Sequence, residues 1–451
     1  QGNRMEQNLT TGSVWKSIAA FSLPYLLSYF LQTLYGMADL FIIGQFGGVA
    51  ETTAVSVGSQ VMHMITVMLV GVAMGTTVTI GRAVGANHPK EAARYIGNTV
   101  TMFMIGSVVL AGILLGLVRP IVGLISTPEE AVPGTVAYLT ICFLGIPCIT
   151  AYNIIASIFR GLGDSKSPMY FIAVACAANI GLDFLFMGAM RLGPAGAALG
   201  TTLSQLVSVV ISLVVILRRK TGIQLTKADF KPQKSPMKQM LSIGIPVALQ
   251  DGFIQVSFMT ITVIANQRGL TDAAAVGIVE KIISFLFLVP SSMLSTVSAL
   301  GAQNIGAGKR DRVEVVLRYA VTIGFGFGAV VAVLMQFIAP MVVRPFTSDA
   351  AVIAAGAQYI RGYIFDCMFA GVQFCFSGYF CAYGKSGLSF LHNTLSIVLV
   401  RVPGAYFGSK FFPQTLLPMG LASACGSLFS SIICVCFWLW LRRTGQTGQK
   451  E

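Results

Sequence analysis

The sequence predicts an all-α membrane protein with twelve transmembrane helices, arranged as two six-helix bundles related by a pseudo-twofold axis along the membrane normal. Three observations lead to this fold class. Of the 451 residues, 55% are hydrophobic and only 10% are charged, whereas about a quarter of the residues of a soluble domain are charged. Apolar stretches long enough to cross a bilayer recur along the whole chain. Sequence patterns of the first half also return in the second half.

The apolar stretches define twelve candidate spans. A helix that crosses the hydrocarbon core needs about 20 predominantly apolar residues, and every stretch reaches that length. The spans cover residues 17–43, 52–80, 95–118, 132–157, 168–190, 193–217, 239–264, 273–301, 313–339, 350–380, 388–409 and 416–441.

The second half of the chain repeats the first half in the same order. Gly85 corresponds to Gly306, and Pro24 corresponds to Pro246 at nearly the same separation along the chain. Because each copy has an even number of spans, both copies cross the membrane in the same direction, which is the parallel-repeat plan of secondary transporters. We therefore predict a substrate site between two lobes and alternating access by rocking of one lobe against the other.

The placement of the basic residues predicts the domain boundaries and the orientation. If the N-terminus is cytoplasmic, 22 of the 30 Lys and Arg residues fall on the cytoplasmic side and five on the outside, as the positive-inside rule requires. The predicted domains are an N-lobe (1–219), a basic cytoplasmic linker (220–237) and a C-lobe (238–451). Both termini are predicted to be cytoplasmic in a multi-pass protein of the plasma or inner membrane. The charge of +13 thus orients the chain and implies no nucleic-acid partner.

The ionisable residues inside the predicted spans differ between the lobes. The N-lobe spans contain Asp39 and Asp183 and no Lys or Arg. A charge in the membrane interior is costly, so such residues are functional candidates. An unpaired buried carboxylate either takes up a proton or recruits a cation. Asn179 lies one helical turn before Asp183 on the same face, and together with Asp39 and nearby hydroxyl groups it offers the oxygen ligands that suit a sodium ion. The alternative is a structural aspartate that caps a broken helix or bonds a Ser or Thr across helices.

The C-lobe spans contain three acids, Asp251, Glu280 and Asp366, together with three bases, Lys281, Arg361 and Arg401, which allows a neutral lobe. A packing role through ion pairs is the favoured interpretation for Glu280 and the three bases. Asp251 and Asp366 are the candidates for contact with a cationic substrate. The predicted substrate cavity comprises Asp251, Gln255, Asp366, Arg401 and His63. The alternative interpretation of His63 is a hydrogen-bonded residue of the interior.

Proline and glycine mark further positions in the spans. Pro24 and Pro246 each remove a helix hydrogen bond, and a static kink and a moving hinge are equally compatible with the sequence. Four pairs of glycines at a spacing of one helical turn indicate close helix packing, and we assign them no chemistry. These pairs are Gly71 and Gly75, Gly112 and Gly116, Gly196 and Gly200, and Gly324 and Gly328.

Several motifs resemble the multidrug and toxic compound extrusion (MATE) family over nearly the whole chain. They include FSLPYLLSYFLQTLYGMADLFIIGQFGG in the first span, ANIGLDFLF in the fifth and GAALGTTLSQ in the sixth, with SIGIP and GAQNIGAGKRD in the second half. The resemblance implies a cation site at Asp39, Asn179, Asp183 and Thr201, lined by Tyr35. It also implies an efflux pump that exchanges an inward-moving proton or sodium ion for an amphipathic, often cationic, compound.

The C-lobe departs from the family pattern. Many relatives carry a glutamate eight residues after the seventh-span proline, where this chain has Ile254. Asp366 lies about one turn before the place of a tenth-span aspartate in some relatives. These departures favour coupling through the N-lobe.

The alternatives are another transporter or an enzyme. A lipid-linked oligosaccharide flippase of the same superfamily would use cationic residues such as Arg361 and Arg401, but it usually has two additional spans. The chain contains no HExxH, GxSxG or P-loop motif, so we expect neither an enzyme nor a cofactor other than the coupling ion. The expected partners are small-molecule substrates and membrane lipid, and the chain is expected to be a monomer. The sequence leaves the substrate and the choice between proton and sodium open.

Overall fold

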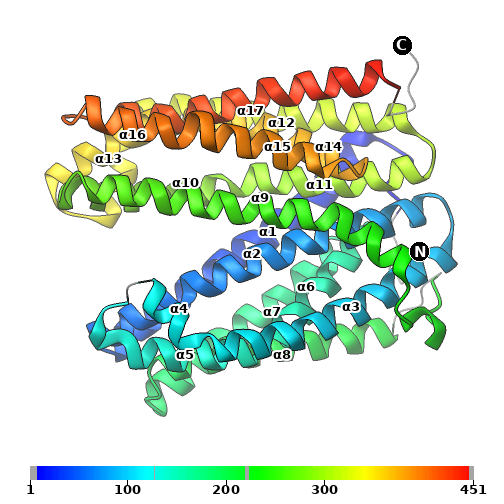
Figure 1. Cartoon of the computed structure of the whole chain (residues 1–451), viewed down its shortest axis with the longest axis horizontal. Coiled ribbons are helices and arrows are strands. Elements are labelled where there is room, and N and C mark those ends of the chain that lie inside the picture. Colours follow the sequence, from blue (N-terminus) through cyan, green and yellow to red (C-terminus); the bar gives the residue numbers. More distant parts are fainter. Residues whose placement is uncertain (1–7, 126, 219–222, 446–451) are drawn as a thin grey trace. The chain divides into compact units, whose positions relative to one another are not determined.

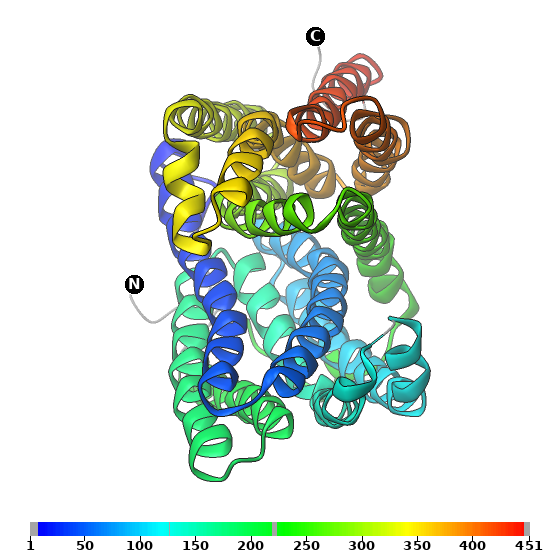
Figure 2. The same ribbon diagram turned by 90° about the vertical axis from the view of Figure 1, so that its left-hand side faces the viewer.

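Helices joined by short turns make up the regular structure of the described residues, which are 8–125, 127–218 and 223–445 of the computed structural model. By their packing they form two units. Unit 1 comprises residues 23–244, and unit 2 comprises residues 9–22 together with the chain from residue 245 onwards. In Figure 1 the long helices within each unit run alongside one another, and Figure 2 views them from one end.

Unit 1 contains most of the first helix and all helices up to the start of α9. Its elements are α1 (Val14–Phe46, shared with unit 2), α2 (Val49–Gly85), α3 (Pro89–Gly116), α4 (Val118–Leu124), η1 (Glu129–Ala131), α5 (Val132–Leu144), α6 (Ile146–Gly161), α7 (Lys166–Asp183), the π-helical η2 (Phe184–Ala189), α8 (Pro194–Arg218) and η3 (Lys227–Phe230).

Unit 2 contains most of α9 and all later helices. Its elements are α9 (Lys234–Asn266, shared with unit 1), α10 (Leu270–Leu286), α11 (Leu288–Gly306), α12 (Arg310–Val343), η4 (Arg344–Phe346), α13 (Ala350–Tyr363), α14 (Phe365–Ala382), α15 (Ser386–Ser396), the π-helical η5 (Ile397–Arg401), α16 (Val402–Phe411) and α17 (Leu417–Arg443).

Each predicted span corresponds to helical structure. Ten helices of the described chain are long and apolar enough to cross a membrane, counting nearly continuous pairs such as α10 with α11 as one. The pair Glu129–Leu144 and Ile146–Gly161, bent by 51°, makes an eleventh if it is a single broken span. The predicted span 388–409 is formed by α15, η5 and α16, which are interrupted by the π-helical segment. His392, Asn393 and Arg401 lower the apolar character of that segment, so length and composition alone do not identify it as a membrane span.

The units depart from the predicted domain boundaries in two places. Residues 9–22 pack with unit 2 although they belong to the predicted N-lobe, and residues 238–244 pack with unit 1 although they belong to the predicted C-lobe. Of the predicted linker 220–237, residues 220–222 lie outside the described residues. The remainder contains η3, which is capped by reciprocal bonds between Thr226 and Asp229.

Close backbone packing holds neighbouring helices together within the units. In unit 2 a side chain at Gly324 would collide with the backbone of Gly371, and one at Gly328 would collide with that of Met368. These contacts join α12 to α14 in the way that glycine pairs predict. Gly112 and Gly116 face open space instead, so the packing interpretation of that pair is wrong.

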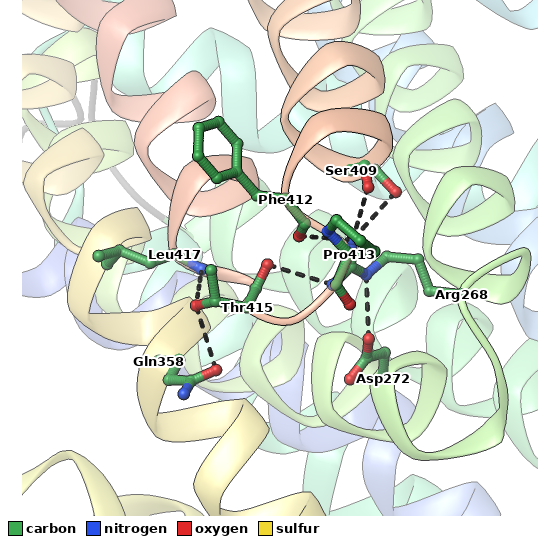
Figure 3. Close-up of polar contacts among 8 residues, drawn as sticks. All are labelled: Arg268, Asp272, Gln358, Ser409, Phe412, Pro413, Thr415 and Leu417. Carbon is green, nitrogen blue, oxygen red and sulfur yellow. Dashed lines mark hydrogen bonds and ion pairs between the residues drawn. The ribbon is translucent and has the colours of Figure 1, made fainter.

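One arginine fixes the end of unit 2 where α9 meets α10 (Figure 3). Arg268 forms an ion pair with Asp272 at 2.9 Å, and only 6% of its side chain is exposed. Its two terminal nitrogens donate to the carbonyl oxygens of Ser409, Phe412, Pro413 and Thr415 at 2.8–3.2 Å. The turn between α16 and α17 is therefore tied to the turn between α9 and α10 through the donor groups of one guanidinium.

Candidate functional site

Three helices of unit 1 bring together the five residues of the predicted cation site. Tyr35 and Asp39 lie one turn apart on α1, Asn179 and Asp183 lie one turn apart on α7, and Thr201 lies on α8. The side chains meet because residues one turn apart share one helix face. The exposed fraction is 3% for Asp39 and 0% for Asn179 and Asp183, so the two carboxyl groups are buried in an apolar unit.

One amide connects the two carboxyl groups. The Asn179 Nδ2 atom donates to Asp39 Oδ1 at 2.9 Å and to Asp183 Oδ2 at 3.3 Å. The hydroxyl group of Thr201 donates to the second oxygen of Asp39, Oδ2, at 2.8 Å. Both oxygens of Asp39 are therefore hydrogen-bonded, whereas Asp183 receives one bond.

Two buried oxygens of the cluster have no hydrogen-bond donor in the described part of the chain. They are Asp183 Oδ1 and Asn179 Oδ1. Buried polar atoms are nearly always satisfied in folded proteins, so these two acceptors could receive a proton or ligate a cation. The bond from Thr201 to Asp39 also agrees with the structural alternative for Asp39, whereas no Ser or Thr hydroxyl group of the described residues donates to Asp183.

A second layer of residues supports the cluster from α8. The Tyr35 hydroxyl group donates to the carbonyl oxygen of Thr201 at 2.9 Å and also contacts the Ser204 hydroxyl group. Gly200 lies against Asp183 so closely that a Cβ atom there would collide with Asp183 Oδ1. Sequence reasoning missed Ser204 and Gly200 as members of the site. The signal for Ser204 was its position one turn after Thr201, on the same face of α8.

The α-helix that carries Asp183 ends at that residue and continues as the π-helical η2. Single π-helical turns inside α-helices occur frequently at functional sites. The segment 397–401 in unit 2 is also π-helical and ends at Arg401. Each unit thus has a π-helical segment next to its central ionisable residue.

The structure pairs two of the predicted C-lobe residues. The guanidinium group of Arg401 contacts both oxygens of Asp366 at 3.3 Å, and Asp366 is buried. Ser427 bonds both partners, and Gln373 donates to Ser427 at 2.9 Å. This network supports the interpretation of Arg401 as a pairing residue. It also occupies the carboxyl group of Asp366, which was a candidate for contact with a cationic substrate.

The remaining predicted residues of the substrate cavity are divided between the two units. Asp251 and Gln255 are half-buried one turn apart on α9, and His63 is exposed on α2. Among the described residues, no ion pair includes Glu280, Lys281 or Arg361. Lys281 is exposed, while Glu280 Oε1 is buried without a donor. The expected compensation of three acids by three bases is therefore seen for Asp366 and Arg401 alone within this part of the chain.

A duplicated bundle of membrane-spanning helices is a plan shared by many transporter folds. The model of the MatE family matches the chain twice, over residues 24–185 and 246–407. The first match begins at Pro24 and the second at its repeat partner Pro246, which confirms the internal repeat. The chain belongs to the MATE family of multi-pass membrane transporters.

Named relatives and solved structures agree with this assignment. A probable multidrug resistance protein, YpnP of Bacillus subtilis, is 29% identical over 94% of each chain. The probable multidrug resistance protein NorM of Thermotoga maritima is 25% identical over 96% of this chain and 95% of its own. An outward-facing multidrug resistance MATE transporter of the MOP superfamily shares the fold with a TM-score of 0.90 over 98% of each chain, at 22% identity. Such transporters have the two helical bundles that the sequence predicts.

Proposed function

We propose that the protein is a secondary active multidrug efflux transporter, which exchanges an inward-moving proton or sodium ion for an amphipathic, often cationic, compound. Coupling takes place in the N-lobe at Asp39, Asn179, Asp183 and Thr201, lined by Tyr35. The observation that supports this proposal most strongly is the Asn179 amide, which is shared by the two buried carboxyl groups of Asp39 and Asp183. The second oxygen of Asp183, Oδ1, has no hydrogen-bond donor among the described residues. Multidrug resistance is the role stated for the relatives that cover nearly the whole chain.

The geometry fits both candidate ions. A proton on Asp183 Oδ1 neutralises one of two neighbouring carboxyl groups, which cannot both be ionised at low cost in an apolar environment. A sodium ion finds oxygen ligands in the two carboxyl groups, in Asn179 Oδ1 and in the Thr201 hydroxyl group. In either case the occupied cluster carries one negative charge less than the empty cluster, so ion binding biases the equilibrium between the two access states.

The energy from one ion suffices for concentrative transport. One elementary charge that crosses about 100 mV yields about 2.3 kcal/mol. Since about 1.4 kcal/mol corresponds to a factor of ten, one ion exchanged for one uncharged substrate sustains a concentration ratio of roughly fiftyfold. For a singly cationic substrate no net charge moves, and the concentration gradient of the ion supplies the energy. We further propose that the transporter works as a monomer by rocking of the lobes, with both termini in the cytoplasm.

The test is dye efflux from proteoliposomes that hold the purified protein, with a pH gradient or a sodium gradient imposed alone. The parent protein should respond to one gradient, and Asp39→Asn and Asp183→Asn should lose gradient-driven accumulation while keeping a monodisperse elution profile. Asp311→Asn, which changes an exposed aspartate, is the control and should transport like the parent. Undiminished accumulation by Asp183→Asn would remove Asp183 from coupling. Movement of lipid-linked oligosaccharides without response to either gradient would favour a flippase.

A further inference from the structure

We propose that Lys281 on α10 binds the anionic group of a transported compound, so that the substrates include amphipathic compounds that carry a carboxylate. This inference rests on the proposed efflux function and narrows its substrate class. It gives Lys281 a role in recognition in place of the packing role that the sequence favoured.

Lys281 is a charge within a predicted span that no acid of the described chain compensates. It lies eight residues after the outer end of the span 273–301, which corresponds to about 12 Å along a helix. Its side chain is exposed, and it forms no ion pair with any described residue. A charge inside a membrane is costly, and such residues nearly always face a water-filled space or find a partner. The partner of this ammonium group must therefore come from outside the folded unit.

The neighbouring acid, Glu280, does not serve as that partner. Successive residues of a helix do not face each other, and the Glu280 Oε1 atom is buried, away from the exposed side of α10. Between the two side chains, both of which are described, there is no ion pair. Lys281 is the only charged residue among the exposed residues of α10.

The face of α10 that carries Lys281 consists of small and polar residues. After Leu270 at the first position, the exposed residues of this helix are Thr271, Ala274, Gly277, Lys281 and Ser284. Their spacing of three or four positions places them in one stripe. The opposite face packs into the apolar core of unit 2 through residues such as Val276, Val279 and Ile283. A stripe without large apolar side chains around a lysine suits water and not lipid tails.

Another helix of unit 2, α12, presents the kind of surface that hydrocarbon requires. Its exposed residues include Val330, Val333, Leu334, Phe337 and Met341, which are 50–78% exposed. On α10, by contrast, Leu270 is the only exposed large hydrophobic residue. The two exposed surfaces therefore differ in kind, and Lys281 lies on the surface that fits an aqueous path.

The internal repeat places a polar face at the same position of unit 1. The correspondence that relates Gly85 to Gly306 also pairs Gln60 with Lys281. Gln60 is exposed on α2, as is His63 one turn later. The first residue of α2 is the only exposed large hydrophobic residue of that helix. The second helix of each repeat thus presents a polar face, and only the copy in unit 2 carries a lysine at this position.

The surroundings of Lys281 leave room for a ligand group. A Cβ atom at Gly277, one turn before Lys281, would meet no atom within 4 Å. Ser284 follows Lys281 by three positions and adds a hydroxyl group to the same stripe. An ammonium group offers three donors and binds an anion as a point charge. The carboxylate of an amphipathic compound would supply the missing counter-charge, and it is the ligand group that we assign to this face.

Binding of a matched pair of dyes tests this assignment. Rhodamine B carries a free carboxylate, which its ethyl ester lacks, and dissociation constants are measured by fluorescence anisotropy with the purified full chain in detergent. Lys281→Gln should weaken the binding of rhodamine B roughly ten- to 100-fold, the range for one hydrogen bond to a charged group, and leave that of the ester undiminished. Lys281→Arg should keep the preference of the parent. Lys410→Gln removes another exposed lysine of unit 2, outside the predicted spans, and should bind both dyes like the parent.

Three results of this binding experiment would overturn the proposal. The first is equal binding of rhodamine B by Lys281→Gln and by the parent. The second is an equal loss for both dyes in Lys281→Gln, which would indicate a structural role. The third is a parent protein that binds neither dye.

Thiol labelling tests the face itself and needs no substrate. Lys281→Cys and Val330→Cys are made in the chain with its nine cysteines replaced. Val330 is the matched control, because it is 61% exposed on α12 and lies nine residues from the outer end of its predicted span, 313–339. A charged, membrane-impermeant thiol reagent should modify position 281 in proteoliposomes and spare position 330. Equally low modification of both positions would place Lys281 in lipid and overturn the proposal.

Efflux of the same two dyes distinguishes a failure of the antiport from a failure of the Lys281 site. Gradient-driven efflux of both dyes, with a loss for rhodamine B alone in Lys281→Gln, would support both. If neither gradient moves either dye while Lys281→Gln still selectively weakens the binding of rhodamine B, the antiport fails and the binding site holds. Gradient-driven efflux of rhodamine B that is the same in Lys281→Gln and the parent would leave the antiport intact and overturn the role of Lys281.

Discussion

Gly200 packs directly against Asp183, and Gly200→Ala should therefore weaken the ion binding proposed at that carboxyl group. A Cβ atom at this position would collide with Asp183 Oδ1 and would lie 3.4 Å from Asp183 Cγ and 3.5 Å from the Asp183 amide nitrogen. The carboxyl oxygen that it meets is the one without a hydrogen-bond donor in the described chain. The added methyl group therefore acts on the oxygen proposed to hold the proton or cation.

The expected magnitude follows from two opposing effects. Alanine favours a helix over glycine by about 1 kcal/mol, which stabilises α8. Overpacking of a well-packed site costs about 1–3 kcal/mol, and here the methyl group displaces the Asp183 side chain. If that cost falls on the ion-occupied form, the apparent affinity for the ion decreases by roughly five- to 150-fold.

Gly181→Ala provides the matched control for this variant. Gly181 lies two residues before Asp183 on α7, is exposed, and would place a Cβ atom in open space. It makes the same chemical change close to the same carboxyl group without touching it. Both variants are assayed for the ion concentration that gives half-maximal dye efflux from proteoliposomes, and for thermal stability in detergent. Equal ion dependence of Gly200→Ala and Gly181→Ala would refute the steric argument.

Two further predictions concern the stability of unit 2. Arg268→Ala should destabilise the protein by about 4 kcal/mol, because it removes four hydrogen bonds of about 1 kcal/mol each together with a half-buried ion pair. The loss should be smaller in Arg268→Lys and less than about 0.5 kcal/mol in the exposed control Arg344→Ala. A thiol-reactive dye reports the melting temperature through the buried cysteines. An unchanged melting temperature of Arg268→Ala would contradict a stabilising role for the Arg268 contacts in Figure 3. Arg401→Met should likewise cost about 3–5 kcal/mol by leaving Asp366 unpaired, and Asp366→Asn in the same chain should restore most of that loss. Failure of this rescue would mean that the two residues act independently.

The sequence predicted that Asn179 and Asp183 of the N-lobe lie together because their spacing places them on one helix face. Asn179 and Asp183 stand one helical turn apart in an otherwise apolar span, and no basic residue of the N-lobe spans offers a partner. Helical periodicity then places both side chains on one face. The structure adds that Asp39 and Thr201 complete this face, which depends on how α1, α7 and α8 pack and is not contained in the periodicity of any one of them.

Other features could not be predicted because they arise from packing between distant segments. The glycine spacing of Gly112 and Gly116 equals that of Gly196 and Gly200, yet the first pair faces open space and the second contacts α7 and η2. Arg268 is one of the five basic residues that the sequence places on the outside. In the structure it donates hydrogen bonds to carbonyl oxygens of a turn that lies far along the chain. Spacing alone does not identify the partner of a glycine or an arginine.

The internal repeat supports the proposal that ion coupling takes place in one lobe and not in the other. The correspondence that pairs Pro24 with Pro246 also pairs Asn179 with Arg401. In unit 1 this position supplies a neutral amide, which bridges two carboxyl groups and leaves their charge to be offset by a proton or cation. In unit 2 it supplies a guanidinium group, which permanently compensates Asp366. We therefore propose that this single position of the duplicated fold determines whether the buried acid of a lobe can respond to an ion. Asn179→Arg should then compensate the N-lobe acids and abolish the response to either gradient.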